Sequence, residues 1–429
     1  MGVDQCNYED WLAARELKYS ATGVERSVKP AATIRRARAV LDIIGVTKVA
    51  DVTDLDRIGI PNFVAVRPHD AEGGISYYNG KGTTRDQAHA GAMMEAIERH
   101  AAERYDGPII AASHANLRRQ GACVDPLDIH VPMVRDYGEN IRLEWAQGFD
   151  LIARRPIYVP LNCLLAPYRP YVGELLFYSS TNGLASGNTR VDALCHALCE
   201  VIERDTVALA MAETLVRPAV IETLSEIGFD QCPTSASPGK PLISLRGLPR
   251  HAAALVRKMQ RAGLGIELRN LTSELGIPTI DCVVTEQEGP SGVAVAYRGA
   301  GTHPDARIAL TRALTEAAQS RLTGIHGGRE DLTDFAPPTA RQLSAPGQPT
   351  ISFGDIPSHE HASVNEDLAF IIDRMRAAGF DQAVAFDLTR AEVGIPVVRV
   401  VVPRAESWTI FIEQSGRAAL GPRALRRIT

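Results

Sequence analysis

Two stretches of the sequence carry one pattern: GTTRDQAHAGAMMEAIER at Gly82–Arg99 and GNTRVDALCHALCEVIER at Gly187–Arg204. Aligned with a constant offset of 105 residues, they are identical at nine of 18 positions. A weaker third copy, ALTRALTEAAQSR at Ala309–Arg321, keeps the alanines and has Glu316 and Gln319 at the glutamate positions. Self-similarity of this length indicates a duplicated structural unit.

Each of the first two copies has the features of an amphipathic helix with a marked start. Thr84 and Thr189 precede the periodic region and are expected N-caps, because a threonine oxygen accepts a hydrogen bond from first-turn N–H groups. Alanines recur every four or five residues along one side, which allows close packing against a neighbouring element. The sequence therefore predicts two matching helices, each opened by a threonine.

Each predicted helix carries two glutamates three residues apart, so both project from one face. The pairs are Glu95 with Glu98 and Glu200 with Glu203. If the two helices face each other, four carboxylates converge, and they cannot all stay ionised without cations. Such oxygen ligands suit Mg²⁺. A solvated charged face with pairs such as Glu95–Arg99 is the alternative interpretation.

Two common kinds of metal or nucleotide site do not fit this pattern. A di-iron helix bundle needs Glu-x-x-His motifs, but Glu98 and Glu203 occupy the positions where histidines are required. The sequence contains no GxxxxGK[ST] phosphate loop, and its GKGTT string is a weak signal by itself. A bound nucleotide is therefore expected to be held through metals on the glutamates, with help from Asn188, Arg312 or Lys18.

Composition describes an ordinary globular chain. Its 429 residues include 51 acidic and 46 basic residues, for a formal net charge of −5. Hydrophobic residues make up 45%, which excludes extended disorder and a coiled-coil rod. Because no large basic surface is available for phosphates, nucleic-acid binding is not expected.

The sequence also bears on location. The first 20 residues lack the apolar segment of a secretory signal. The longest apolar runs fall short of the ~20 residues that span a bilayer, so no membrane association is expected. The seven cysteines form no CxxC pair, and Cys195 and Cys199 are interpreted as small buried residues rather than zinc ligands. We expect a reducing, cytoplasmic location.

Three Gly-Ile-Pro phrases are each followed by β-branched residues, at Gly59–Pro61, Gly276–Pro278 and Gly394–Pro396. A turn glycine and a proline suited to a strand's first residue predict a strand after each phrase. Amphipathic periodicity predicts helices at Arg85–Arg104, Val191–Ala212, Leu248–Ala262, Ile308–Leu322 and Asp367–Ala378. The expected fold class is mixed α/β (α+β), with duplicated strand–helix units and one main core.

Three segments in this order resemble the hallmark motifs of the YcaO family: KGTTRDQAHAGAMMEAIER, SSTNGLASGNTRVDALCHALCEVIERD and GAGTHPDARIALTRALTEAAQSRL. The resemblance runs from about Lys18 to at least Asp331. It implies the YcaO fold around one ATP site and ATP-dependent modification of peptide backbone amides, with ATP and Mg²⁺ as cofactors. The amide oxygen is phosphorylated, a nucleophile attacks the carbonyl carbon, and phosphate leaves.

The resemblance also implies roles for individual residues. Magnesium ligands carried over by motif are Glu95, Glu98, Glu200 and Glu203. ATP-binding residues carried over are Lys18, Arg26, Gly91, Glu95, Asn188, Asp192, His196, Arg204, Arg312 and Glu316. Gly91 and His196 depart from the family pattern, which has a small, often hydroxylated residue and an amide side chain there. No side-chain nucleophile is expected, because the transfer depends on positioning and charge neutralisation.

The expected organisation is a single YcaO catalytic domain over residues 1–429. Its parts are an N-terminal segment at about 1–58, a core with the three motifs at 59–333, a Pro-rich loop at 334–361 and a C-terminal part at 362–429. The family-like region starts almost at the N-terminus, so no fused leader-binding domain is expected.

Thioamide formation is the favoured reaction. Azoline-forming members end in a PxPxP tail, which EQSGRAALGPRALRRIT lacks, and RLTGIHGGREDL at Arg321–Leu332 resembles members that work with a TfuA partner. The alternatives are azoline formation on Cys, Ser or Thr of a ribosomal peptide, and a non-catalytic scaffold for peptide modification. Expected partners are a peptide or protein substrate, a TfuA-like sulfide-delivery protein and a separate leader-recognition protein; a homodimer stays open.

Overall fold

The computed structural model describes residues 8, 11, 15–21, 24–68, 75–133, 136–226, 239–286, 295–327, 348–410 and 419–428. Two sequence features fall largely outside these ranges: residues 334–347 of the predicted Pro-rich loop and residues 328–332 of RLTGIHGGREDL. The described end of that loop is not plain surface loop, because β14 (Thr350–Ile351) pairs in parallel with β10 (Leu242–Ile243).

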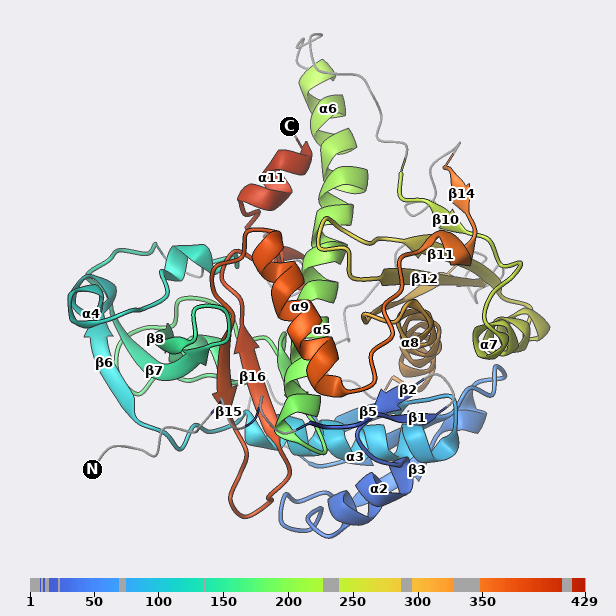
Figure 1. The fold of residues 1–429 in the computed structure, drawn as a ribbon, viewed down its shortest axis with the longest axis horizontal. Coiled ribbons are helices and arrows are strands. Elements are labelled where there is room, and N and C mark those ends of the chain that lie inside the picture. The colour runs from blue at the N-terminus through green and yellow to red at the C-terminus, as the bar shows by residue number, and fades with distance from the viewer. Residues whose placement is uncertain are drawn as a thin grey trace.

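All five predicted helices are present (Figure 1). The helices are α2 (Pro30–Arg38), α3 (Arg85–Ala101), α4 (His114–Gln120), α5 (Arg190–Met211), α6 (Arg217–Glu226), α7 (Arg250–Arg261), α8 (Ala306–His326), α9 (Val364–Ala377) and α11 (Pro422–Ile428). A π-helical turn, Ala212–Val216, joins α5 to α6, so that the two form the long central column of Figure 1. No helix in the described ranges is long and apolar enough to cross a bilayer.

The strands form four separate sheets. They are β1 (Tyr19–Ala21), β2 (Val24–Arg26), β3 (Lys48–Asp51), β4 (Asn62–Val66), β5 (Tyr77–Lys81), β6 (Ile109–Ser113), β7 (Arg142–Asp150), β8 (Arg155–Pro160), β9 (Leu184–Ser186), β10, β11 (Gly265–Asn270), β12 (Thr279–Glu286), β13 (Val295–Thr302), β14, β15 (Val384–Asp387) and β16 (Val397–Val401). Their orders are β1-β2, β3-β4-β5, β13-β12-β11-β10-β14 and β6-β7-β15-β16-β9, with β8 on β7. The mixed α/β fold class is confirmed.

The three Gly-Ile-Pro phrases each lead into a strand, as predicted. They precede β4, β12 and β16, respectively. Their glycines, Gly59, Gly276 and Gly394, have φ between 65° and 66°, a left-handed conformation that costs a side chain more than it costs glycine. The phrase is therefore a recurrent turn that admits the chain to a sheet.

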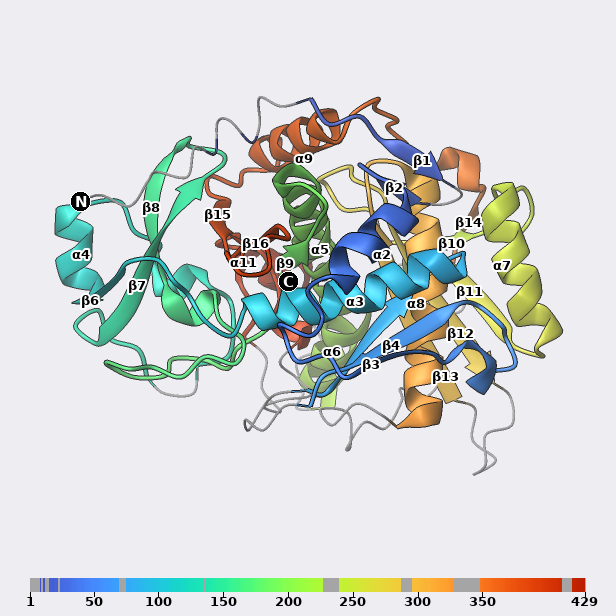
Figure 2. The same ribbon diagram turned by 90° about the horizontal axis from the view of Figure 1, so that it is seen from below.

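The repeated segments form three strand–helix units: β5 with α3, β9 with α5, and β13 with α8. Thr84 and Thr189 cap their helices, accepting from the N–H groups of Gln87 at 3.3 Å and Asp192 at 3.2 Å. Each helix contacts its own strand and also the strand of another unit, α3 with β9, α5 with β13 and α8 with β5. The three units therefore close into a ring, and Figure 2 shows α3, α5 and α8 crossing in its middle.

The ring is tight because strand glycines meet helix alanines. A Cβ at Gly80 would lie 2.1 Å from the carbonyl oxygen of Ala88, and one at Gly301 would lie 2.0 Å from that of Ala309. Gly187 likewise abuts the backbone of α5. The helix alanines are buried, as their periodicity predicted.

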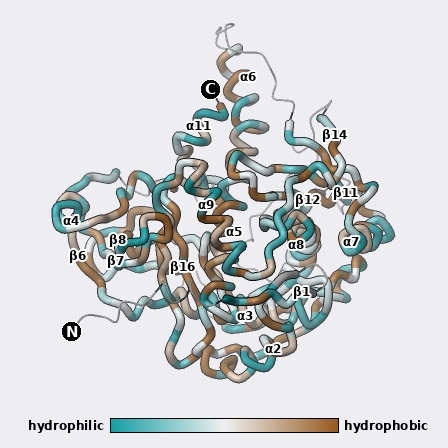
Figure 3. The backbone as a smooth tube through the Cα atoms, viewed as in Figure 1, coloured by the Kyte–Doolittle hydropathy of each residue, from teal (hydrophilic) through white to brown (hydrophobic). Residues whose placement is uncertain are grey.

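The apolar core differs from the single core that we predicted. Buried residues gather in three larger clusters, one under each repeated helix: α3 with β7 and β8, α5 with α9 and β16, and α8 with α7 and β12. Figure 3 shows hydrophobic segments along α5 and β16 and hydrophilic ones on α4 and α7. The apolar burial is thus divided among clusters, each containing residues of one repeated helix, which a count of apolar residues cannot reveal.

Adding a side chain where a strand glycine contacts a helix alanine should destabilise the ring. We expect Gly80→Ala to lower the free energy of unfolding by about 1–3 kcal/mol. The new methyl group would clash with backbone atoms of α3, which cannot move aside as the end of a flexible side chain can. Chemical denaturation measures this. Gly354→Ala is the control, since its Cβ meets nothing within 4 Å. Equal stability of both variants would contradict the close approach.

Candidate active site

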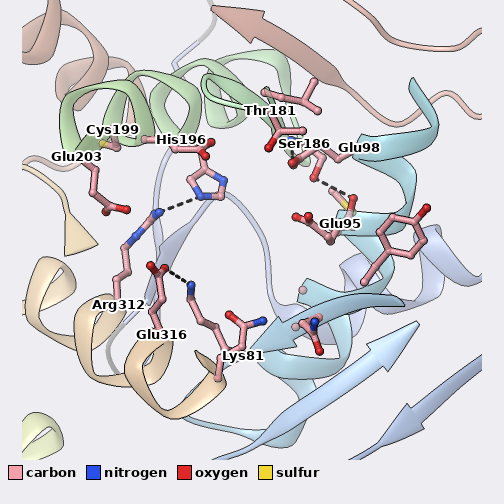
Figure 4. Close-up of a pocket in the computed structure, with 18 of the residues that line it drawn as sticks. Lys81, Glu95, Glu98, Thr181, Ser186, His196, Cys199, Glu203, Arg312 and Glu316 are labelled. Carbon is pink, nitrogen blue, oxygen red and sulfur yellow. Dashed lines mark hydrogen bonds and ion pairs between the residues drawn. The ribbon is translucent and has the colours of Figure 1, made fainter. Parts of the chain in front are cut away.

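A cavity of about 1550 Å³ lies where α3, α5 and α8 meet. Figure 4 shows Glu95 and Glu98 on α3 across this cavity from Glu203 on α5 and Glu316 on α8. The predicted site residues that line it are Arg26, Gly91, Glu95, Glu98, Asn188, Asp192, His196, Glu200, Glu203, Arg204, Arg312 and Glu316. The structure thus gathers residues from three distant parts of the sequence into one cavity.

Two of the four repeated glutamates are buried, and the other two are partly buried beside them. Glu98 is 8% exposed and Glu203 is 2% exposed. Burial, followed by the charges of Glu95 and Glu200, holds the pKa of Glu98 well above its usual range. Burial also raises the pKa of Glu200 to about 7, against the opposing effect of Arg204. The prediction that the carboxylates converge is therefore reflected in their protonation.

The carboxylates act on one another in sequence across the cavity. After burial as the main cause, the pKa of Glu98 is raised by Glu95 and Glu200, that of Glu200 by Glu203 and then Glu95, and that of Glu203 by Glu316 on α8. Glu95 also forms the predicted ion pair with Arg99, whose Nε lies 3.1 Å from Glu95 Oε1. The alternative interpretation of a charged pair is thus partly right, but the pair lies in the cavity wall.

The carboxylate oxygens of the cavity suit a hard cation, but they do not form a complete coordination shell by themselves. Glu203 Oε2 is buried and finds no hydrogen-bond partner among the described residues, which is costly for a carboxylate unless a cation satisfies it. Glu98 Oε2 accepts only the Ser186 N–H, at 2.8 Å. No three of the His, Cys, Asp and Glu side chains in the described ranges form a ready metal group. Magnesium suits such a site, because it keeps several waters and substrate oxygens as ligands.

His196 lies between two arginines. Arg26 Nη2 is 3.2 Å from Nδ1, and Arg312 Nη2 is 3.0 Å from Nε2. Burial, together with these arginines, holds the pKa of His196 well below its usual range, so the ring is neutral. A neutral imidazole has only one acceptor nitrogen. One guanidinium therefore has an N–H that His196 cannot satisfy, and this N–H is available to an anion.

Arg312 is the better candidate for that role. Arg26 is also held by Asp192, whose Oδ1 lies 3.3 Å from Nη1. Asp192 is 3% exposed and accepts the N–H of Asn188 at 3.2 Å. Asn188 Oδ1 in turn accepts from Thr33 Oγ at 2.9 Å. Arg26, Asp192 and Asn188 thus form a hydrogen-bonded wall, whereas His196 is the hydrogen-bond partner found for the Arg312 side chain in the described part of the chain.

Sequence reasoning missed Lys81. It ends β5, and its Nζ lies 2.5 Å from Glu316 Oε2 in the cavity (Figure 4). The pKa of Glu316 is about 2, because the effects of Lys81 and Arg204 outweigh burial. The signal was present in GKGTT, where a lysine stands shortly before a predicted helix. As a phosphate-loop motif this string is weak, and the lysine by itself was the informative residue.

Lys18 does not line the cavity. Its Nζ lies 2.7 Å from Asp367 Oδ2, and its side chain is 5% exposed. Asp367 does line the cavity and also faces His303, at 3.7 Å from Nε2. Lys18 is therefore placed behind the wall, where it neutralises Asp367.

The cysteines of α5 behave as predicted for small buried residues. Cys195 and Cys199 are 6% and 1% exposed. A hydrogen bond with Cys199, followed by burial, holds the pKa of the Cys195 thiol well above its usual range. A neutral thiol is a poor nucleophile, so these residues do not suggest covalent catalysis.

Comparison with known proteins identifies one family. The YcaO family model, described as YcaO cyclodehydratase, ATP- and Mg²⁺-binding, matches residues 79–406. An uncharacterized protein of Methanothermobacter thermautotrophicus is 36% identical over 91% of this chain and 98% of its own. A protein of Rhizobium leguminosarum bv. trifolii, named for its place in the tfuA 3′ region, is 32% identical over 97% of this chain and 96% of its own.

A solved structure has the same fold. YcaO from Methanopyrus kandleri, bound with AMPPCP and Mg²⁺, superposes with a TM-score of 0.71 and 27% identity over 95% of this chain and 98% of its own. A heterocyclase in complex with substrate and cofactor has a TM-score of 0.73 at 20% identity, covering 92% of this chain and 54% of its own. The second likeness shows the fold alone.

Removing one buried charge should stabilise the metal-free protein. Because the pKa of Glu200 rises from 4.5 to about 7 on folding, the folded state binds more protons, and stability falls as pH rises through this window. In EDTA at pH 8 we expect Glu200→Gln to raise the free energy of unfolding by about 1–3 kcal/mol, with no gain at pH 4.

Urea denaturation at the two pH values measures the effect. The matched control is Glu95→Gln, which removes a carboxylate that is 32% exposed and paired with Arg99 and should not stabilise. Equal free energies of unfolding of wild type and Glu200→Gln at pH 8 would show that the ionised Glu200 carboxylate does not destabilise the folded protein.

Proposed function

The chain belongs to the YcaO family, and from this we propose that it activates peptide backbone amides with ATP and replaces the amide oxygen with sulfur. The observation that carries the proposal is the burial of repeated glutamates opposite Lys81, Arg26 and Arg312 in one cavity. Clustered carboxylates, with Glu203 Oε2 lacking a partner among the described residues, beside a set of basic groups suit metal ions and the phosphates of a nucleotide. The cavity is large enough to admit a peptide segment as well.

Magnesium would be held by Glu95, Glu98, Glu200 and Glu203, and when bound it neutralises charge on the transferring phosphoryl group. The orphaned Oε2 of Glu203 and the raised pKa of Glu200 support this assignment. Among these four glutamates, Glu203 is the one whose pKa is raised by Glu316 on α8, after burial as the main cause.

Basic residues would orient the nucleotide. Arg312 would leave His196 for a phosphate oxygen, since the neutral ring satisfies only one arginine. Lys81 would be shared between Glu316 and a phosphate. Arg26 would stay with Asp192 and define the wall. These are separate roles for three cations that all reach one cavity.

The proposed chemistry balances without an acid–base pair from the protein. The amide oxygen attacks the γ-phosphorus of ATP and ADP leaves. Hydrosulfide then adds to the activated carbon, and inorganic phosphate departs with the former amide oxygen. One amide, ATP and hydrosulfide thus yield one thioamide, ADP and phosphate.

Sulfur is favoured as nucleophile by one comparison. The Rhizobium relative, aligned over 97% of this chain, is named for its place in the tfuA 3′ region. We extend the proposal to a TfuA-like partner that delivers sulfide. Azoline formation on Cys, Ser or Thr is the second candidate, because the family description names cyclodehydratase activity.

Loss of one metal-facing carboxylate should stop the reaction. We expect Glu203→Gln to abolish ATP consumption that depends on substrate peptide, because the residue keeps its shape but loses its charge. The control is Glu222→Gln on the exposed part of α6, which should leave the rate unchanged. Normal turnover by Glu203→Gln would contradict the metal assignment.

Product mass separates the candidates. Purified protein, TfuA-like partner, ATP, sulfide and peptide are incubated, and the peptide is analysed by mass spectrometry. Exchange of oxygen for sulfur is the expected result. Loss of one water indicates azoline formation instead, and an unchanged peptide with no ATP consumption indicates a non-catalytic scaffold.

A further inference from the structure

A second, much smaller cavity of about 60 Å³ adjoins the first. Tyr178, Ser180 and Asn182 line both cavities, so the two are neighbours across one short segment. A single water needs about 10–15 Å³ of such space. The small cavity therefore has room for a few waters or one small anion, and not for a nucleotide or a peptide side chain of any length.

A buried arginine dominates this cavity. Arg399, on β16, is 4% exposed, and its Nη2 donates to the carbonyl oxygen of Ser180 at 2.8 Å. Its Nε and Nη1 are buried and have no hydrogen-bond partner among the described residues. A buried guanidinium without a partner is costly. These two N–H groups are therefore the strongest indication that something occupies the cavity.

No carboxylate among the described residues forms an ion pair with Arg399. Glu98 and Glu200 act on it electrostatically from the main cavity, yet neither forms an ion pair with it, and Arg99 opposes them. Burial lowers the pKa of Arg399 to about 10, so it remains a cation at neutral pH. An anion in the small cavity would supply the missing counter-charge.

The rest of the wall selects the kind of anion. Valines line part of it, Val201 and the stretch Val400–Val402, and polar side chains such as His130 and Asn182 line the rest. The Cys163 thiol also lines it, and burial raises its pKa to about 12, so it adds no competing charge. Asn182 Oδ1 is a further buried polar atom without a partner in the described ranges. A guanidinium is weakly hydrated, and in a small cavity with this mixed wall it suits a small monovalent anion.

We propose that the Arg399 cavity binds hydrosulfide, a small monovalent anion, and holds it beside the main cavity. The assignment rests on the proposed thioamide chemistry for its biological ligand, and on Arg399 and the cavity for the site itself. The segment around Ser180 and Asn182 lines both this site and the main cavity. The cavity thus keeps the nucleophile close to the activated amide while excluding larger nucleophiles.

Direct binding tests the site without any activity. Crystals of the wild-type protein are soaked in sodium bromide, and bromide is located by its anomalous scattering. Bromide within hydrogen-bond distance of Arg399 Nε or Nη1 is expected. Water alone in the cavity would overturn the proposal, and this outcome is independent of whether the protein makes thioamides.

Kinetics test the ligand. We expect Arg399→Met to raise the sulfide concentration for half-maximal thioamidation by about tenfold, as for loss of a hydrogen bond to a charged group, without changing the KM for ATP. Arg399→Lys should recover part of this loss. The matched control is Arg390→Met, which removes a buried arginine that is paired with Asp106 at 2.7 Å.

The outcomes separate two roles of Arg399. If it only neutralised Glu98 and Glu200, Arg399→Met would change the KM for ATP and the magnesium dependence and leave the sulfide dependence unchanged, which would overturn the proposal. If the product proves to be an azoline, bromide binding still tests the anion site, but its ligand is not hydrosulfide, and that assignment is overturned.

Discussion

Burial of like-charged carboxylates is the constraint on which this structure depends. Glu98 and Glu203 are almost completely buried, and Glu200 has a pKa near 7 because it is also removed from water. A fold with no use for these groups would leave them on its surface, since each buried charge lowers stability. The protein instead arranges three helices so that their carboxylates meet cations inside one cavity.

The ring of strand–helix units makes that burial feasible. Each helix packs on its own strand through glycine and alanine and also touches the strand of another unit. The close approach brings the helix backbones near the cavity, so that side chains such as Glu203 and Arg312 can reach it. The three larger apolar clusters each include buried residues of one of these helices. The same helices therefore contribute both to the hydrophobic core and to the cavity wall.

The arginines near these carboxylates differ in how their N–H groups are satisfied. Arg99 is paired with Glu95, Arg312 shares a neutral histidine with Arg26, and Arg399 has N–H groups without a partner in the described part of the chain. The first is a structural ion pair. Arg312 competes with Arg26 for the single acceptor nitrogen of His196, and Arg399 has two N–H groups without a partner among the described residues. A guanidinium with an N–H to spare attracts an anion.

The sequence by itself determined the local elements and the pairing of the glutamates. Helix periodicity, threonine caps and Gly-Ile-Pro turns depend on neighbours within a few residues, so α3, α5 and the strands after the three turns were predictable. Lys81 beside Glu316, the separation of Lys18 from the cavity wall and the unpartnered Arg399 were decided only by the tertiary structure. These contacts join residues far apart in the chain, and their energies depend on burial, which no local pattern specifies.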